Sequence, residues 1–322
     1  MKYKILALII CLWLTQTWCI AKMNLPGKAK LIEGVIYKET PQGVLRLDIF
    51  KPDSTSHQTS PVFVFIHGGS WSALDRTTIR SAFRFQMLEK LLQEGYAVVS
   101  IDYRLVNDKN EVIYPEPLSD CMDAIRWIRK EQLNYGFDIA KIAVGGCSAG
   151  GHLALMTAYA PELLAPGSVE LKSYSARVNC CVDIYGPTHL GKMFLPTLLP
   201  PVLALAHLVI PKAKMHERQM LLQAFTRQNS SHPWRRHRIC KVFSPVSYVD
   251  RAVPTIIFHG NKDGLVPFAQ SRLLQKKLQK RNKIVLLKVI EGQDHGFPTL
   301  DKSRGEKIAA ETYNFLLRYN HT

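Results

Sequence analysis

The stretch GGCSAGGH, Gly145 to His152, places four glycines around Ser148. It follows the apolar run KIAVGG (141–146), which has the length of a buried strand, and it leads into GHLALMTAYA (151–160), which continues as a helix. A G-x-S-x-G motif between a strand and a helix is typical of a sharp turn that lifts the serine hydroxyl clear of the sheet. Glycines allow the chain segments to cross closely at such a turn. The sequence therefore predicts an α/β fold that presents Ser148.

Strands and helices alternate along most of the chain. Continuous apolar runs suit strands that are buried on both faces, and their alternation with helical patterns is typical of a parallel sheet. With 322 residues, 47% hydrophobic and 21% charged, the chain is globular rather than disordered or fibrous. We expect a doubly wound, mostly parallel, eight-stranded sheet flanked by helices. The expected strands are 34–39, 44–51, 62–66, 96–103, 141–146, 178–186, 255–260 and 284–290, and the clearest helices are 80–93, 118–129, 151–160 and 306–319.

Two side chains follow later strands where partners of Ser148 are expected. A serine hydroxyl needs a base to remove its proton, and the base needs an orienting group. Asp263 follows the strand TIIFHG and His295 follows IVLLKVI, so both lie at carboxyl ends, in the chain order serine, acid, histidine. Each has a plainer explanation by itself, because Asp263 lies in a turn-like sequence and Asp294 stands beside His295. Their joint placement predicts Ser148, Asp263 and His295 as catalytic residues.

The segment FIHGGSW ends the strand 62–66 and predicts an oxyanion hole. The N–H groups of Gly68 and Gly69 can turn toward a developing negative oxygen, and the N–H of Ala149, directly after the serine, would complete the set. Such donors are among the largest contributions to this kind of catalysis. We expect His67 to hold the loop by hydrogen bonds rather than to transfer protons.

These segments together resemble the α/β-hydrolases. The resemblance rests on HGGSW, IDYRL, YPEPLSDCMDAIRWI, IAVGGCSAGGHLAL, HGNKDGLVP and DHGF, and it runs from about Val35 to the last helix with one insertion. The chain is most similar to serine esterases that resemble hormone-sensitive lipase and bacterial acetylxylan or feruloyl esterases. This resemblance implies a nucleophilic serine, a histidine general base, an orienting aspartate and backbone oxyanion donors at the positions named above, with no cofactor.

Two positions depart from the pattern of that family. Many relatives have a third glycine where this chain has Ser70, which changes the expected shape of the oxyanion loop. Many also have Asp or His where Cys147 stands, which leaves the polarity beside the serine open. Neither departure removes a predicted catalytic group.

The first 21 residues are predicted to be a signal peptide. They combine a positively charged start, an apolar run at 5–14 and the cleavage-site pattern Cys19-Ile20-Ala21. A lipid-modified Cys19 is the alternative, and the apolar run is too short for a stable membrane anchor. We expect 22–322 to form one α/β-hydrolase domain that is exported, either to the periplasm or into the medium.

Cleavage would leave five cysteines in an oxidising compartment, enough for two disulfides at most. Four of them lie within apolar patterns, where a free buried thiol is the expected state: Cys121, Cys147, Cys180 and Cys181. The sequence shows no metal-ligand spacing, so we expect no metal.

Residues 190–241 form an insertion after the sixth strand, where hydrolases of this kind often carry a lid or cap. Its first half is apolar and broken by prolines, whereas the whole segment carries nine Lys and Arg against the single acid Glu217, a net charge of +8 within a chain total of +16. One interpretation is a solvated charged face. The other is a lid that meets an anionic membrane or an anionic substrate. Nucleic acid is not expected for an exported hydrolase.

The leading hypothesis is therefore an exported serine carboxylesterase that hydrolyses small-molecule esters through an acyl-enzyme. An arylformamidase-like amidase or a peptidase on the same scaffold is the alternative, because triad chemistry does not separate esters from amides. A catalytically silent binding protein is less compatible with three intact catalytic positions.

Overall fold

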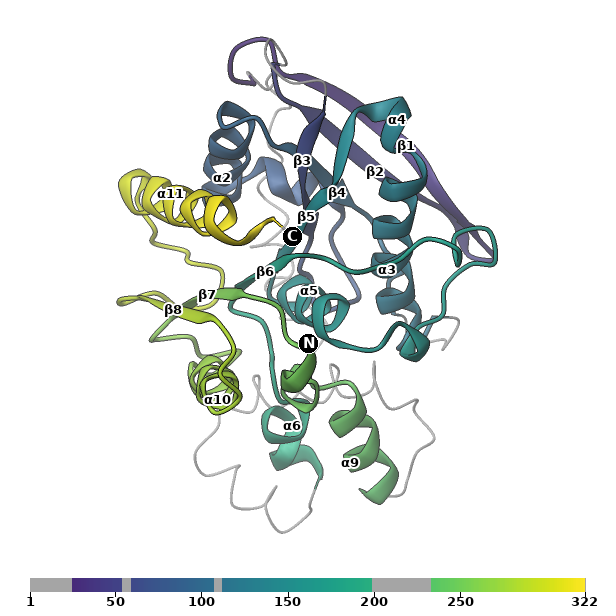
Figure 1. Cartoon of the computed structure of the whole chain (residues 1–322). Helices are drawn as coiled ribbons and strands as arrows, with labels where there is room; N and C mark the ends of the chain where they lie inside the picture. Colours follow the sequence, from purple (N-terminus) through teal and green to yellow (C-terminus); the bar gives the residue numbers. More distant parts are fainter. Residues whose placement is uncertain (1–24, 54–58, 107–111, 199–232, 322) are drawn as a thin grey trace, which may run out of the picture.

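The computed structural model describes residues 25–53, 59–106, 112–198 and 233–321 (Figure 1). Eight strands form one sheet in the order β1-β2-β4-β3-β5-β6-β7-β8. Strand β2 is antiparallel to β1 and β4, and the other neighbouring pairs are parallel. The predicted mostly parallel, eight-stranded sheet is thus confirmed. The strands are β1 (Lys30–Thr40), β2 (Gly43–Lys51), β3 (Ser60–Ile66), β4 (Ala97–Ile101), β5 (Phe137–Cys147), β6 (Cys180–Ile184), β7 (Thr255–Gly260) and β8 (Val285–Ile290).

The four predicted helices are present, with ends that differ by a few residues. Helix α11 begins earlier than expected because the Asp301 carboxylate caps it, accepting the N–H of Arg304 at 2.8 Å. Helix α10 adds to the predicted elements. The helices are α2 (Ala82–Gln93), α3 (Glu116–Lys130), α4 (Gln132–Tyr135), α5 (Ala149–Tyr159), α6 (Leu190–Leu198), α9 (Pro233–Val242), α10 (Ala269–Gln279) and α11 (Lys302–Tyr319), with short 3-10 turns η1 (Arg76–Arg80), η2 (Glu162–Leu164), η3 (Pro245–Ser247) and η4 (Val249–Arg251).

The sheet separates two apolar cores, and strand β3 contributes to both. Val62, Val64 and Ile66 face the core that contains α3 and α5, whereas Phe63 and Phe65 face the core that contains α2 and α11. Figure 1 shows these helix pairs on opposite faces of the sheet. Because side chains alternate along a strand, a strand covered on both faces must be apolar at every position. This explains the unbroken run VFVFI in the sequence.

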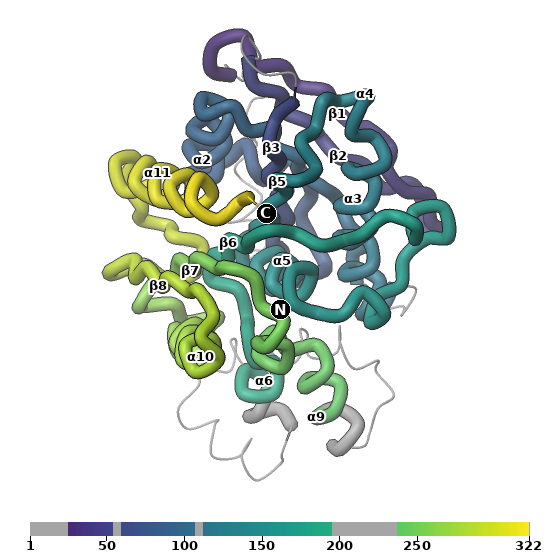
Figure 2. The backbone as a smooth tube through the Cα atoms, viewed as in Figure 1, coloured from purple at the N-terminus to yellow at the C-terminus, as the bar shows by residue number. Residues whose placement is uncertain are grey.

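The insertion after β6 begins with α6, and its other described end is α9. These two helices pack on each other, and Figures 1 and 2 place them at the same end of the molecule as α10. The remainder of the predicted lid and the predicted signal peptide lie outside the described residues. Within the described ranges, no helix has the length and apolarity needed to cross a membrane.

The cysteines of the described ranges are free and buried. The predicted free thiols at Cys121, Cys147, Cys180 and Cys181 are therefore confirmed, and Cys240 shares their state.

Candidate active site

Ser148 occupies the turn between β5 and α5 that the sequence predicted. Its φ of 56° and ψ of −120° are unusual for a residue with a side chain, and its N–H donates to the carbonyl of Ile184 at 2.9 Å. The crossing is tight, because a Cβ added to Gly150 would lie 2.1 Å from the backbone oxygen of Ile66. Glycine is therefore required beside Ser148, for the reason expected from the sequence.

The structure brings Ser148, His295 and Asp263 into one row of hydrogen bonds. His295 Nε2 lies 2.8 Å from Ser148 Oγ, and His295 Nδ1 lies 2.8 Å from Asp263 Oδ2. The imidazole is largely buried, with 15% of its side chain exposed, and the Asp263 carboxylate is fully buried. With Nδ1 donating to the carboxylate, Nε2 is free to accept the serine proton.

The Asp263 carboxylate receives four donors. Its Oδ1 accepts the N–H groups of Leu265 at 2.9 Å and Val266 at 2.8 Å, while its Oδ2 faces His295 and also His259 Nε2 at 3.2 Å. Burial by itself raises the pKa of Asp263, but the hydrogen bonds and charges of His259 and His295 outweigh burial and lower it to about 2. The carboxylate is therefore ionised throughout the neutral range.

Asp294, the alternative acid, has a different place. Its Oδ1 accepts the N–H of Gly264 at 2.8 Å and that of His295 at 2.7 Å, so it joins the two loops instead of contacting the imidazole. The loops also meet at Gly260, where a Cβ would lie 2.2 Å from the carbonyl oxygen of Gln293. These contacts hold the Asp263 loop against the His295 loop.

Two of the predicted oxyanion donors, Gly68 and Ala149, lie beside Ser148. A Cβ added to Gly68 would be 3.4 Å from the Cβ of Ser148, so the loop after β3 packs directly on the serine. Ala149 is the first residue of α5, where backbone N–H groups have no partner within the helix. In the described parts of the chain, no acceptor takes the N–H of Gly68, Gly69 or Ala149.

The oxyanion loop follows an unusual backbone path through Ser70. Gly69, Ser70 and Trp71 have φ values of 93°, 56° and 60°, all in the left-handed region. Glycine adopts that region freely, so Ser70 takes the conformation that a third glycine would take more easily. The carbonyl of Gly69 accepts N–H groups from Ser72 at 3.0 Å and Ala73 at 2.9 Å, which closes the loop.

Cys147 is the second position that departs from the expected family pattern, and the structure shows its environment. Its side chain is buried, and burial raises the pKa of the thiol to about 11. The residue before the serine is therefore neutral, where Asp or protonated His would be charged.

Two further residues near this site, His259 and Tyr103, have roles that the sequence did not predict. His259, at the end of β7, has Nε2 2.9 Å from the carbonyl of Val266 and Nδ1 2.7 Å from Ser271 Oγ, so its Nε2–H is directed at the acid loop. Tyr103, two residues after β4, contacts the backbone of the oxyanion loop. The motifs HGNKDGLVP and IDYRL contained both residues, but a side chain that acts through another residue leaves no spacing signal.

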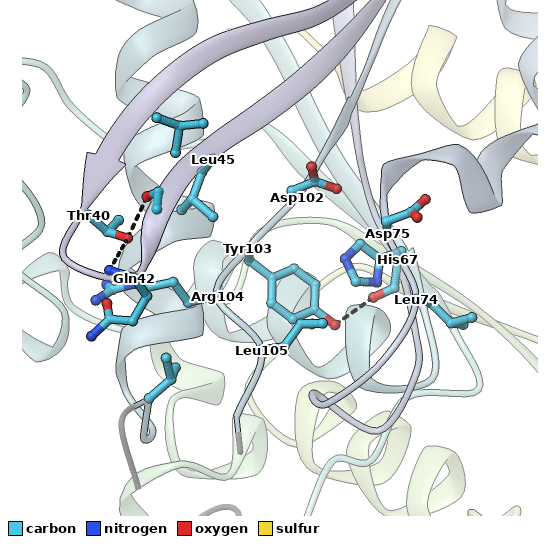
Figure 3. Close-up of a pocket in the computed structure, with 13 residues that line it drawn as sticks. Thr40, Gln42, Leu45, His67, Leu74, Asp75, Asp102, Tyr103, Arg104 and Leu105 are labelled. Carbon is cyan, nitrogen blue, oxygen red and sulfur yellow. Dashed lines mark hydrogen bonds between the residues drawn. The ribbon is translucent and has the colours of Figure 1, made fainter. Parts of the chain in front are cut away.

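A cavity of about 440 Å³ lies between the β1–β2 turn and the segment after β4 (Figure 3). Tyr103 and His67 line it, whereas Ser148, Asp263 and His295 do not. The cavity therefore adjoins the oxyanion loop rather than the hydrogen-bonded residues Ser148, His295 and Asp263. Among the described residues, no group of His, Cys, Asp and Glu has the arrangement of a metal site.

Comparison with known families identifies the group to which the chain belongs. The family model BD-FAE matches residues 47–278, which is more than half of the chain. The chain belongs to the BD-FAE family. The matched range includes Ser148 and Asp263, and His295 follows it.

Curated relatives of this BD-FAE chain carry esterase names. Esterase LipC of Mycobacterium tuberculosis (strain ATCC 25618 / H37Rv) is 29% identical over 277 residues, which are 84% of this chain and 60% of LipC. The probable carboxylic ester hydrolase LipM of the same organism is 28% identical over 278 residues, 84% of this chain and 57% of LipM. The chain thus spans about three fifths of the length of these relatives.

Solved structures confirm the predicted α/β-hydrolase fold of this BD-FAE member. An esterase from Thermogutta terrifontis with propionate bound is 26% identical and has a TM-score of 0.67, covering 91% of this chain and 94% of its own. The same esterase has been solved phosphorylated by paraoxon. A truncated carbohydrate esterase from gut microbiota has a TM-score of 0.70 at 22% identity, covering 91% of this chain and all of its own, and this likeness concerns the fold alone.

Proposed function

We propose that this protein is a serine carboxylesterase that hydrolyses small carboxylic esters through an acyl-enzyme on Ser148. The observation that carries the proposal is the position of His295, whose Nε2 lies 2.8 Å from Ser148 Oγ and whose Nδ1 lies 2.8 Å from Asp263 Oδ2. The esterase names of the relatives support the reaction class. The propionate-bound relative supports a short acyl group.

In the first half of the reaction, Ser148 Oγ attacks the ester carbonyl carbon while its proton passes to His295 Nε2. Asp263 remains a carboxylate and stabilises the imidazolium that forms, because its pKa of about 2 keeps it ionised. The carbonyl oxygen becomes an oxyanion, which accepts hydrogen bonds from the N–H groups of Gly68, Gly69 and Ala149. His295 then protonates the leaving alcohol, and an acyl-Ser148 ester remains.

In the second half, His295 takes a proton from water, and the resulting hydroxide attacks the acyl-serine carbonyl. Collapse of this second tetrahedral intermediate releases the carboxylic acid and returns the proton to Ser148 Oγ. The same groups serve both halves, so no further reactant is needed.

The test is Ser148→Ala, with Ser72→Ala as a control at an exposed serine of the neighbouring loop. We expect Ser148→Ala to lower kcat on p-nitrophenyl acetate by about 10⁵–10⁶ and to abolish labelling by a fluorophosphonate probe, while Ser72→Ala keeps both. Circular dichroism should show both variants folded. Unchanged labelling or turnover in Ser148→Ala would refute the proposal.

The alternative amidase or peptidase activity is tested with the same protein. Rates on p-nitrophenyl esters from acetate to palmitate, N-formylkynurenine and peptide anilides are compared. We expect the short esters to have the highest kcat/KM. A higher value for formylkynurenine or an anilide would assign the site to amides, and no turnover of any substrate would favour a silent binding protein.

We further propose that the enzyme is exported and that its basic surface contacts anionic lipid. We define the basic surface as Lys192, Arg238, Lys241, Lys276 and Lys277, which are exposed and form no ion pair with any described residue. Two of these cations lie near His189: burial lowers the pKa of His189, and Lys192, Lys277 and His237 lower it further. An anionic bilayer attracts each such cation by about 1 kcal/mol.

Vesicle binding tests this surface. Vesicles containing phosphatidylserine should bind the protein at 0.1 M salt and release it at 1 M, since the Debye length falls from ~10 Å to ~3 Å. Changing Lys192, Arg238 and Lys277 to Gln should weaken binding without altering p-nitrophenyl acetate turnover. Equal binding by this variant would leave the charge as a solvated face.

A further inference from the structure

The Tyr103 side chain reaches two consecutive carbonyl groups of the oxyanion loop. Its hydroxyl lies 3.1 Å from the carbonyl oxygen of His67 and 3.0 Å from that of Gly68. Figure 3 shows the hydroxyl directed at the backbone oxygen of His67. Burial raises the pKa of Tyr103 well above its ordinary range, so the hydroxyl keeps its proton and donates it, shared between the two oxygens.

His67 contacts both the Tyr103 ring and the carbonyl group of Gly68. Its ring stacks on the Tyr103 ring, with centroids 4.2 Å apart and planes inclined by 12°. Its Nδ1 lies 2.8 Å from the carbonyl oxygen of Gly68, and since a carbonyl only accepts, Nδ1 must carry the proton. Burial lowers the pKa of His67 to about 4, so the ring is neutral at working pH. Two side-chain donors thus converge on the carbonyl of Gly68.

Peptide geometry connects these carbonyls to the catalytic groups. In a trans peptide unit, the C=O of one residue and the N–H of the next point in opposite directions. The carbonyl of His67 is paired in this way with the N–H of Gly68, and the carbonyl of Gly68 with the N–H of Gly69. A donor that holds both carbonyls on one side therefore turns both N–H groups to the other side.

We propose that Tyr103, supported by His67, is a positioning residue that aims the N–H groups of Gly68 and Gly69 at the oxyanion above Ser148. The assignment rests on the proposed serine hydrolase function. Tyr103 donates to both carbonyls, whereas His67 donates to that of Gly68 alone. Neither Tyr103 nor His67 needs to touch the substrate.

Tyr103→Phe tests the assignment, because it removes one hydroxyl and keeps the ring that stacks on His67. We expect kcat on p-nitrophenyl acetate to fall about 10- to 100-fold, less than the ~10²–10³ seen when an oxyanion donor is removed outright, with KM nearly unchanged. Tyr37→Phe is the matched control. The Tyr37 hydroxyl is also buried and donates to a main-chain carbonyl, that of Asp102 at 2.7 Å, but outside the oxyanion loop.

A trifluoromethyl ketone supplies a readout that a general loss of stability would not change. Ser148 Oγ adds to its carbonyl carbon, the serine proton passes to His295, and the ketone oxygen becomes an oxyanion, as in ester hydrolysis. The inhibition constant for this tetrahedral adduct should rise in Tyr103→Phe by the same factor as kcat falls. In Tyr37→Phe, both should stay within about twofold of the wild type.

His67 variants give an independent test of the same contact. His67→Asn keeps a side-chain N–H near the position of Nδ1, whereas His67→Leu removes it. We expect kcat to fall less in His67→Asn than in His67→Leu.

Unchanged kcat and unchanged inhibitor affinity in Tyr103→Phe would overturn the assignment, as would equal losses in Tyr103→Phe and Tyr37→Phe. These failures differ from failure of the proposed function itself, which would appear as retained turnover in Ser148→Ala.

Discussion

Two buried carboxyl groups at the ends of neighbouring parallel strands have pKa values shifted in opposite directions. Asp183 lies in β6 and Asp263 follows β7, and both interact with His259. Asp263 receives four donors, and its pKa is lowered to about 2. Asp183 accepts one, the N–H of Gly186 at 2.9 Å, and its Oδ2 has no hydrogen-bond partner in the described ranges. Burial raises the pKa of Asp183 to about 7.

The difference shows that donors, rather than burial, decide which carboxyl is charged. Both groups have lost water, which disfavours a carboxylate. The loop after β7 turns its own N–H groups of Leu265 and Val266 back onto Asp263, whereas Asp183 lies within a strand whose N–H groups pair with the neighbouring strands. A carboxylate that must stabilise an imidazolium is therefore found on the loop and not in the strand.

The largest expected effect is on kcat, which should depend on Asp263 and hardly on Asp183. Asp263→Asn should lower kcat by about 10⁴, because the amide no longer stabilises the imidazolium, whereas Asp183→Asn and Asp294→Asn should each change kcat less than about tenfold. The measurement is turnover of p-nitrophenyl acetate by folded variants. A loss in Asp294→Asn that matches or exceeds that in Asp263→Asn would make Asp294 the acid.

The second effect concerns stability against pH. The fold favours the protonated form of Asp183. Its ionisation therefore does not reduce the free energy of unfolding below about pH 4, where a free aspartate is also protonated, and reduces it by the full amount above about pH 7. As pH rises through this window, the free energy of unfolding of Asp183→Asn should therefore increase by about 2–4 kcal/mol relative to that of the wild type.

Urea unfolding at pH 4, 5.5, 7 and 8 measures this gain. Asp53→Asn is the control, because that carboxylate is exposed. A constant difference between Asp183→Asn and wild type across these pH values would contradict the inferred protonation of Asp183. Asp263 behaves oppositely: its stabilisation is present above about pH 4 and is lost as pH falls toward 2.

The smallest effect concerns His259, which lies between the two carboxyl groups. His259→Leu removes one donor to Asp263 and should lower kcat about tenfold, because the carboxylate is then held less firmly toward His295. His259→Gln keeps an N–H near the position of Nε2 and should recover most of the loss. If the Gln variant is as slow as the Leu variant, the role of His259 is packing alone.

The sequence alone was sufficient to predict the eight strands along the chain and a mostly parallel sheet. Runs such as VFVFI and TIIFHG are apolar at every position because both faces of the sheet are covered. The turn at Ser148 was predictable as well, because the glycines required by a close crossing lie within two residues of the serine. These features depend on residues that are close together in the chain, so the spacing of residue types in the sequence predicts them.

The tertiary structure decided what depends on contacts between distant segments. It placed Asp263 rather than Asp294 on the imidazole of His295, and it brought Tyr103 to the carbonyls of a loop 35 residues away. It also gave Asp183, which lies in β6, and Asp263, which follows β7, different protonation states, although both residues are aspartates. The reason is that hydrogen bonds form where backbones meet in space, and the number of donors at a carboxylate depends on the path of the folded chain.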